Sequence, residues 1–234
     1  MNLTKIAKKI ASDLQLPSPI TERLKDFGVN QDSLKYIGSG IHGAAYKSGS
    51  VVLKVTDDQN EAKAANHLVG RNNKHIVNVY DVLGYQDNGK LRYYIIQEYL
   101  EPISIGDARE FDEAMGNYGV RIGPFVIPGM KGDWSKYEKK VLENAKKQAR
   151  SDAMDLGDEE MDNTIEMYVD KAKKSLDTLK NKFKLDEIMK EMDSLGIQHT
   201  DYKSDNIRKR GQDYVIIDMS EAKSPGSEPK YVNP

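Results

Sequence analysis

Three glycines between two short apolar stretches are the first residues whose spacing suggests chemistry. Gly38, Gly40 and Gly43 form a Gly-x-Gly-x-x-Gly pattern. Glycine lets the backbone adopt positive φ angles and approach a phosphate closely, so the pattern predicts a phosphate-covering loop. A dinucleotide-binding turn would continue into a helix. Residues 44–47 instead have the composition of a strand, which favours a strand–loop–strand arrangement.

Lys54 lies among apolar neighbours in the stretch 51–55. A lysine in a strand is usually an exposed residue at a sheet edge. An ammonium group in this apolar setting could instead reach the α- and β-phosphates of a nucleotide. A buried lysine needs an anionic partner, and Glu61 in the next helix-forming stretch is the best candidate.

A polar cluster near the C-terminus contains the groups that phosphoryl transfer requires. Asp201 and Asn206 precede a predicted hairpin, and Asp218 follows its second apolar strand. One carboxylate can accept or orient a substrate hydroxyl, while a carboxylate and an amide oxygen are suitable ligands for Mg²⁺. Lys203 could neutralise charge on the transferred phosphoryl group. A polar turn between a helix and a hairpin is the alternative interpretation, and the order of these residues argues against it.

The elements that must position these residues begin with a small sheet. Three strands are expected over 34–37, 44–47 and 51–55, followed by a helix over 60–69. Two further strands, 76–83 and 91–97, are joined by a turn with an Asn-Gly pair, a strong hairpin signal. The first hundred residues therefore predict an antiparallel sheet with one helix inserted after the third strand.

The remaining segments are predicted to be mainly helical. Residues 103–132 have no clear period and are expected to be irregular, whereas 133–193 have helical composition. Apolar residues recur every three or four positions over 161–183, which predicts a core-facing helix surface, with a partner-binding coiled coil as the alternative. Residues 207–217 predict a hairpin. Residues 2–14 form a short amphipathic pattern, interpreted as a packing helix rather than a membrane-surface helix, and Pro17 and Pro19 are expected to break the chain.

The composition excludes several classes of protein. The 234 residues include 35 basic and 37 acidic ones, a net charge of −2, which argues against a general nucleic-acid binder. No apolar run approaches the roughly 18 residues that a membrane-spanning helix needs, and the N-terminus lacks the apolar core of a secretory signal. Cysteine is absent and no pair of the four histidines has HExxH spacing, so disulfides and a zincin-type site are not expected. A reducing cytoplasm fits this composition.

Taken together, these motifs resemble the eukaryotic-type Ser/Thr protein kinase superfamily, over roughly residues 34–100 and 185–222. The resemblance implies an α+β, protein-kinase-like two-lobe fold. Its N-lobe would be an antiparallel sheet plus one helix, and its reduced C-lobe would be mainly helical. The expected division is an N-terminal helical extension over 1–33, an N-lobe over 34–100 and a C-lobe over 101–234. A charged helical insertion at about 103–183 would replace part of the usual C-lobe.

The resemblance also implies how ATP would be bound. Gly38, Gly40 and Gly43 would cover its phosphates. Lys54 would contact the α- and β-phosphates and pair with Glu61.

The remaining roles fall on three later segments. Gln97 would occupy the gatekeeper position, and the backbone of Glu98 to Leu100 would bind adenine. Asp201 would be the catalytic base, and Lys203 would stabilise the γ-phosphate. Mg²⁺ would be bound by Asn206 and Asp218.

Departures from the family pattern leave three functions open. The main expectation is a minimal Ser/Thr protein kinase that acts on an unknown protein substrate in the cytoplasm, with no membrane or general nucleic-acid partner. Few residues follow Asp218, and the expected absence of a peptide-docking region favours a small-molecule kinase of the aminoglycoside-phosphotransferase type, although Lys203 argues against it. Met219 and Ser220 replace Phe and Gly after the metal aspartate, which suggests a pseudokinase binding module as the third alternative.

Overall fold

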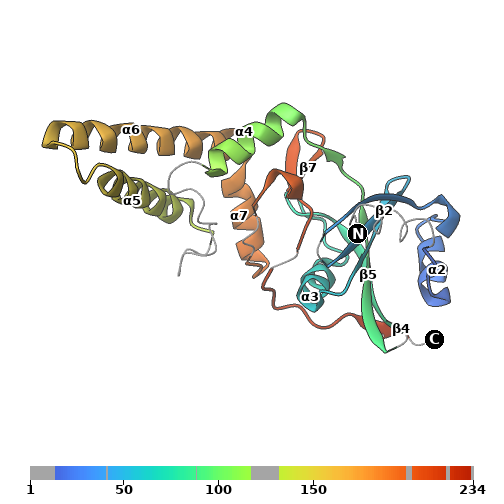
Figure 1. The fold of residues 1–234 in the computed structure, drawn as a ribbon. Helices are drawn as coiled ribbons and strands as arrows, with labels where there is room; N and C mark the ends of the chain where they lie inside the picture. The colour runs from blue at the N-terminus through green and yellow to red at the C-terminus, as the bar shows by residue number, and fades with distance from the viewer. Residues whose placement is uncertain are drawn as a thin grey trace, which may run out of the picture. The chain divides into compact units, whose positions relative to one another are not determined.

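The computed structural model describes residues 14–40, 42–87, 89–116, 132–198, 202–219 and 222–232. The chain divides into two compact units (Figure 1). Unit 1 comprises Met1–Asn73, Val77–Leu100 and Ala222–Pro234, and unit 2 comprises Lys74–Ile76 and Glu101–Glu221.

Unit 1 is built on a six-stranded sheet with the order β1-β2-β3-β5-β4-β9. Neighbouring strands are antiparallel, except that β9 runs parallel to β4. Helix α3 (Gln59–Leu68) is inserted between β3 and β4, as the sequence predicts. The strands are β1 (Lys35–Ser39), β2 (Gly43–Ser48), β3 (Val51–Thr56), β4 (Val79–Asp87), β5 (Lys90–Glu98) and β9 (Lys230–Val232).

The start of the fourth strand differs from the prediction. The sequence places a strand over 76–83, but β4 begins at Val79, and residues 74–76 belong to unit 2. Ile76 forms a parallel bridge with Ile216 of that unit. The apolar run of 76–83 is therefore divided between two cores, which a reading of local pattern cannot detect.

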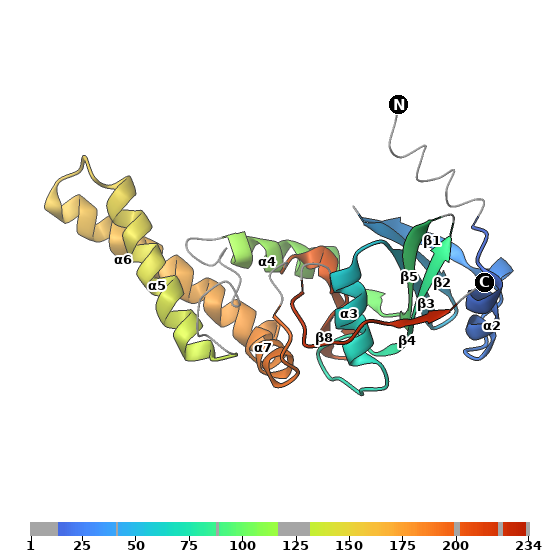
Figure 2. The ribbon, with the colours of Figure 1, turned by 90° about the horizontal axis from the view of Figure 1, so that it is seen from below.

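Alternation along β3 and β5 assigns their side chains to two different faces of the sheet. Leu53 and Ile96 lie in one apolar cluster with Ile20 and Leu24 of helix α2 (Ser18–Lys25), and all four are fully buried. Lys54 is one position out of phase with Leu53 and lies on the other face, which α3 covers. Figure 2 shows α2 and α3 on opposite sides of the sheet.

Helix α2 forms where the sequence pattern does not predict a helix. The sequence predicts a break at Pro17 and Pro19, but in the structure Pro17 is the N-cap and Pro19 lies in the first turn of the helix. Proline is well tolerated there because the first N–H groups of a helix have no intrahelical partner. Arg23 fastens α2 to the sheet by donating from Nε to Asp81 Oδ2 at 2.5 Å. The helix predicted over 2–14 falls, apart from Leu14, outside the described residues.

Unit 2 is mainly helical, with a small sheet in the order β6-β7-β8. The apolar stripe predicted over 161–183 faces the core from Tyr168 to Phe183, which confirms the core-facing interpretation there. No helix in the described ranges is long and apolar enough to cross a membrane. The elements are β6 (Glu101–Pro102), α4 (Ile105–Gly116), α5 (Trp134–Asp152), α6 (Asp158–Asp177), a π-helical turn η3 (Thr178–Lys182), α7 (Leu185–Ser194), a 3₁₀ turn η4 (Ser204–Asn206), β7 (Ile207–Arg210) and β8 (Asp213–Ile216).

The sequence predicts irregular structure over 103–132, and this prediction is wrong for residues 105–116, which form helix α4. Phe111, Ala114 and Met115 are buried on one face of that helix, at the spacing of an amphipathic pattern. Glycines near both ends of α4 hide this amphipathic pattern in the sequence. Residues 117–131 lie outside the described part.

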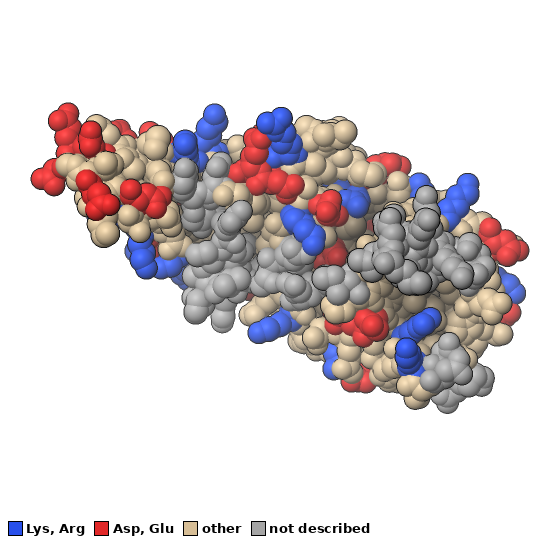
Figure 3. Space-filling model, viewed as in Figure 1, with Lys and Arg blue, Asp and Glu red and all other residues tan. Residues whose placement is uncertain are grey.

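Acidic side chains gather over the start of α6, whose first turn carries Asp158, Glu159 and Glu160 (Figure 3). Carboxylates are favoured at the positive end of the helix dipole.

We expect Leu24→Ala to lower the free energy of unfolding by about 2–5 kcal/mol, because it leaves a cavity between α2 and the sheet. Ile105→Ala is the control, since Ile105 is 90% exposed, and it should change that free energy by less than about 0.5 kcal/mol. Urea denaturation of both variants measures the difference. Equal effects would contradict the packing of α2 on the sheet.

Candidate active site

Lys54 and Glu61 form an ion pair inside unit 1. Lys54 Nζ contacts Glu61 Oε1, and the two side chains are 19% and 3% exposed. Helix α3 begins where Asp58 accepts a hydrogen bond from the Asn60 N–H at 2.8 Å, which places Glu61 in the first turn. A carboxylate this buried is costly unless it meets a cation, so the pair ties α3 to β3. The contact expected from the sequence is therefore present.

The glycine-rich loop joins β1 to β2. Gly40 donates its N–H to Gly43 O at 3.0 Å, which closes the turn. Gly43 must be glycine for packing, because a Cβ there would lie 2.0 Å from Val55 O. A Cβ at Gly38 or Gly40 would meet no atom within 4 Å. Packing in the described part of the chain therefore does not require glycine at these two positions, and close approach of a ligand remains a reason for it. Ile41 lies outside the described residues.

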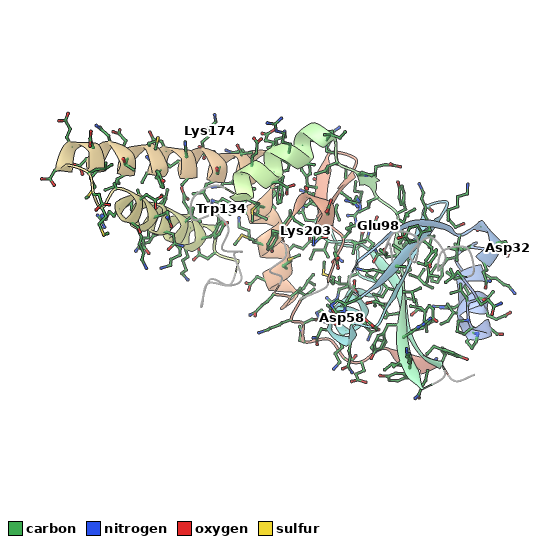
Figure 4. The ribbon with its side chains drawn as sticks, in the orientation of Figure 1. Asp32, Asp58, Glu98, Trp134, Lys174 and Lys203 are labelled. Atoms are coloured by element: carbon green, nitrogen blue, oxygen red, sulfur yellow. The ribbon has the colours of Figure 1, made fainter. Side chains whose placement is uncertain are left out.

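The segment expected to contact adenine, residues 97–100, includes the end of β5, which pairs with β3. Gln97 is buried opposite Val52, so it lies on the same face of the sheet as Lys54. The Glu98 N–H donates to Asn78 O at 3.0 Å, and the Asn78 N–H donates to Glu98 Oε1 at 2.6 Å. Figure 4 labels Glu98 at the end of this strand.

Part of the backbone expected to bind adenine already has partners. Besides Glu98, the Tyr99 N–H donates to Ser50 O at 2.7 Å. In the part of unit 1 that the structure describes, the Leu100 N–H donates to no backbone acceptor. Adenine recognition by this segment would therefore fall to the Leu100 N–H and to backbone carbonyl groups.

In unit 2, the hairpin of β7 and β8 brings the two predicted metal ligands to neighbouring positions. Ile207 pairs with Ile216, and the Ile217 N–H donates to Asn206 O at 3.0 Å. Asp218 follows directly and is half-buried, while Asn206 is buried. Their amide and carboxylate oxygens are ligand types that suit Mg²⁺. The described residues contain no group of three or more His, Cys, Asp or Glu that could hold a metal.

The loop before the hairpin is held by Asp112, a residue that no sequence motif points to. Asp112 of α4 accepts from the Ser204 hydroxyl at 2.6 Å and from the Ser204 N–H at 2.9 Å. The Asn206 N–H donates to Lys203 O at 3.0 Å, which shapes the turn η4, and the Lys203 side chain is exposed. No local signal identifies Asp112, because its partner is distant in the sequence. Asp201, the predicted base, lies outside the described residues, as do the two residues before it.

Two lysines and an aspartate connect α4 to this hairpin. Asp107 lies 2.8 Å from Lys182 Nζ and 3.3 Å from Lys209 Nζ of β7. Hydrogen bonds from Lys182 and then Lys209 lower the pKa of the Asp107 carboxyl to about 2. Lys182 also pairs with Glu110. The network therefore fastens the hairpin that carries Asn206 and Asp218 to the helices of unit 2.

His75 holds the segment 74–76 in unit 2. Its Nδ1 lies 3.0 Å from Tyr214 O and its Nε2 lies 3.1 Å from Glu187 Oε2. The backbone N–H groups of Lys74 and His75 donate to the carboxylate of Glu191. Lys74 and then His75 lower the pKa of Glu187. This buried histidine thus has a structural role beside the hairpin.

Comparison with known proteins gives few matches by sequence. No protein-family model matches the chain, and no curated protein matches it. Among solved structures 201 chains match. One is a ternary complex of streptomycin, ATP and APH(2″)-IIa, with 16% identity and a TM-score of 0.34. The match covers 92% of this chain and 74% of that chain.

The chain has the α+β fold class that the sequence predicts. Unit 1 has a sheet that is antiparallel except for β9, with one helix inserted after the third strand, and unit 2 is mainly helical. The ion pair of Lys54 and Glu61 links the inserted helix to the sheet.

We expect Asp107→Asn to lower the melting temperature at pH 7, and this deficit to shrink as the pH falls from about 4 towards 2. The pKa of Asp107 is lower in the folded chain than in the unfolded chain, so its carboxylate stabilises the fold above the unfolded value. That contribution is lost on acidification through the folded value. Thermal unfolding of both proteins across this pH range provides the test. A deficit of constant size would contradict the ion pairing.

Proposed function

We propose that the chain is an ATP-dependent phosphotransferase that moves the γ-phosphate of ATP to a hydroxyl group. The observation that carries the proposal is the pair formed by Lys54 and the buried Glu61. Glu61 restrains the lysine side chain, so that its ammonium group is positioned before a nucleotide arrives. Such preorganisation avoids the cost of arranging charge during the reaction.

Unit 1 would hold the nucleotide. The lysine ammonium would neutralise charge on the α- and β-phosphates, and the open positions Gly38 and Gly40 would let backbone N–H groups approach them. The Leu100 N–H would donate to adenine. These roles need only groups that the sheet and α3 position.

Unit 2 would supply the transfer chemistry. Asp201 would accept or orient the acceptor hydroxyl proton, and Lys203 would balance charge on the γ-phosphate. Asn206 and Asp218 would hold Mg²⁺, which, when bound, neutralises phosphate charge. The hydrogen bond from Ile217 to Asn206 supports this assignment, because it keeps the two ligand-bearing positions adjacent.

A small-molecule hydroxyl is the acceptor that we propose. The chain leaves unit 2 shortly after Asp218, and residues 222–232 belong to unit 1, where β9 pairs with β4. That segment is therefore not used in unit 2 as a platform for a peptide. A protein acceptor remains the second candidate, because Lys203 matches the pattern of kinases that act on Ser or Thr.

Lys54→Ala and Asp201→Asn should each lower transfer of labelled γ-phosphate by about 10²–10⁴-fold, the usual effect of losing a general base or a charge-stabilising group. Transfer is measured with purified chain, Mg²⁺·ATP and a panel of acceptors. Lys174→Ala and Asp162→Asn, on the exposed face of α6, are matched controls that should retain activity. Persistence of transfer in both site variants would refute the assignment.

The acceptor panel separates the remaining alternatives. Saturable transfer to an aminoglycoside or another polyhydroxylated compound would support the small-molecule proposal, whereas transfer only to a generic protein would support the second candidate. If Mg²⁺·ATP raised the melting temperature but no acceptor were phosphorylated, the chain would be a nucleotide-binding pseudokinase.

Asp218→Asn should raise the Mg²⁺ concentration needed for half-maximal transfer by at least about tenfold, since it replaces a charged ligand with a neutral one. The measurement is a Mg²⁺ titration at saturating ATP. Asp213→Asn, on the same hairpin, is the control and should leave the titration unchanged. An unshifted curve for Asp218→Asn would show that this carboxylate does not bind the metal.

A further inference from the structure

The segment of residues 226–232, here called the strap, binds helix α3 through polar contacts. Asn66 Nδ2 donates to the backbone oxygens of Ser227 and Glu228 at 3.2 and 3.4 Å. Gln59 Nε2 donates to the Glu228 carboxylate at 2.7 Å, and Lys63 Nζ lies 3.3 Å from the same oxygen. Hydrogen bonds from the Tyr231 hydroxyl and then from Lys63 lower the pKa of Glu228, which favours its ionised form.

Close packing anchors the strap at both ends. A Cβ on Gly226 would lie 2.2 Å from the backbone oxygen of Lys63. At the other end β9 pairs with β4, and the Tyr231 ring covers Gly84, where a Cβ would lie 2.8 Å from the ring. The strap therefore connects α3 to the edge of the sheet on which that helix packs.

The strap and Lys54 contact opposite faces of α3. At about 100° per residue, the positions that contact the strap span roughly 100° of the helix surface. Glu61 lies roughly opposite the middle of that arc and shares its face with the buried Leu68. The contact positions are Gln59, Lys63, Asn66 and His67.

We infer that the strap is a positioning segment that keeps α3 seated and so keeps Glu61 against Lys54. The helix has ten residues, and a helix this short is marginal without tertiary contacts. The sheet supplies those contacts on one face and the strap supplies them on the other. The consequence for nucleotide binding rests on the function proposed above, whereas the seating of α3 does not.

Gly226→Val tests the seating of α3, because the larger side chain collides with the Lys63 backbone oxygen and displaces the strap. Amide hydrogen exchange over residues 59–68 should become about tenfold faster, as expected when two hydrogen bonds of ordinary strength are lost. Gly157→Val is the matched control, since a Cβ at Gly157 meets no atom within 4 Å, and it should leave this exchange unchanged. Unchanged exchange in Gly226→Val would overturn the inference.

A milder variant distinguishes local loosening of α3 from unfolding of the whole of unit 1. Asn66→Ala removes the hydrogen bonds that Asn66 donates to the strap, leaves the contacts of Gln59 and Lys63 in place and adds no bulk. It should accelerate exchange in α3 by a smaller factor while β2 and β3 keep wild-type rates. Uniform acceleration throughout unit 1 would show that the strap stabilises the whole unit rather than α3, and would overturn the inference.

A double-mutant cycle with Glu61→Gln tests whether the strap acts through Glu61. If it does, Gly226→Val should weaken ATP binding about tenfold in the wild-type background and have little further effect in Glu61→Gln. Additive losses would overturn the inference. If the wild-type chain bound no ATP, the proposed function would fail. In that case the free energy of unfolding is measured for the same two single variants and the double variant. Non-additive effects of Gly226→Val and Glu61→Gln would support the inference, and additive effects would overturn it.

Discussion

The arrangement of unit 1 depends on a buried carboxylate that must meet a cation. Glu61 is almost completely buried, and removing a carboxylate from water is unfavourable unless it is paired and hydrogen-bonded. Lys54 can provide that charge only if β3 presents it towards α3 and if α3 packs closely on the sheet. Strand register, the seating of the helix and the position of the lysine are therefore linked by one interaction.

The alternation of β3 explains how a charged site and an apolar core share one thin sheet. Leu53 points into the cluster beneath α2, and Lys54 points to the face that carries α3. A register shift of one residue would bury the lysine under α2 and move the leucine to the face that carries α3, so the hydrophobic core specifies the register strongly. Because α2 covers the apolar face and α3 covers the face with Lys54, unit 1 can hold both an apolar core and a buried ion pair.

Unit 2 positions its polar residues by a different means. The hairpin of β7 and β8 places Asn206 beside the residue that precedes Asp218, and α4 then fastens the hairpin through Asp107 and Asp112. These are charge-assisted contacts at half-exposed sites rather than one deeply buried pair. Charged groups near the surface are screened by water, so several such contacts are needed to hold the loop.

The sequence alone determined the parts of the protein that depend on local pattern. Strands β1, β2, β3 and β5 and helix α3 were predicted from local composition and alternation, and the contact of Lys54 with Glu61 was predicted because a buried lysine needs an anionic partner. Only the tertiary structure decided the start of β4 at Val79, the strap on α3 and the support of Ser204 by Asp112. Each of these depends on residues that are far apart in the chain, and their contacts become favourable only after the chain has folded. Local periodicity cannot report such contacts, because it records which face a residue prefers and not which partner covers it.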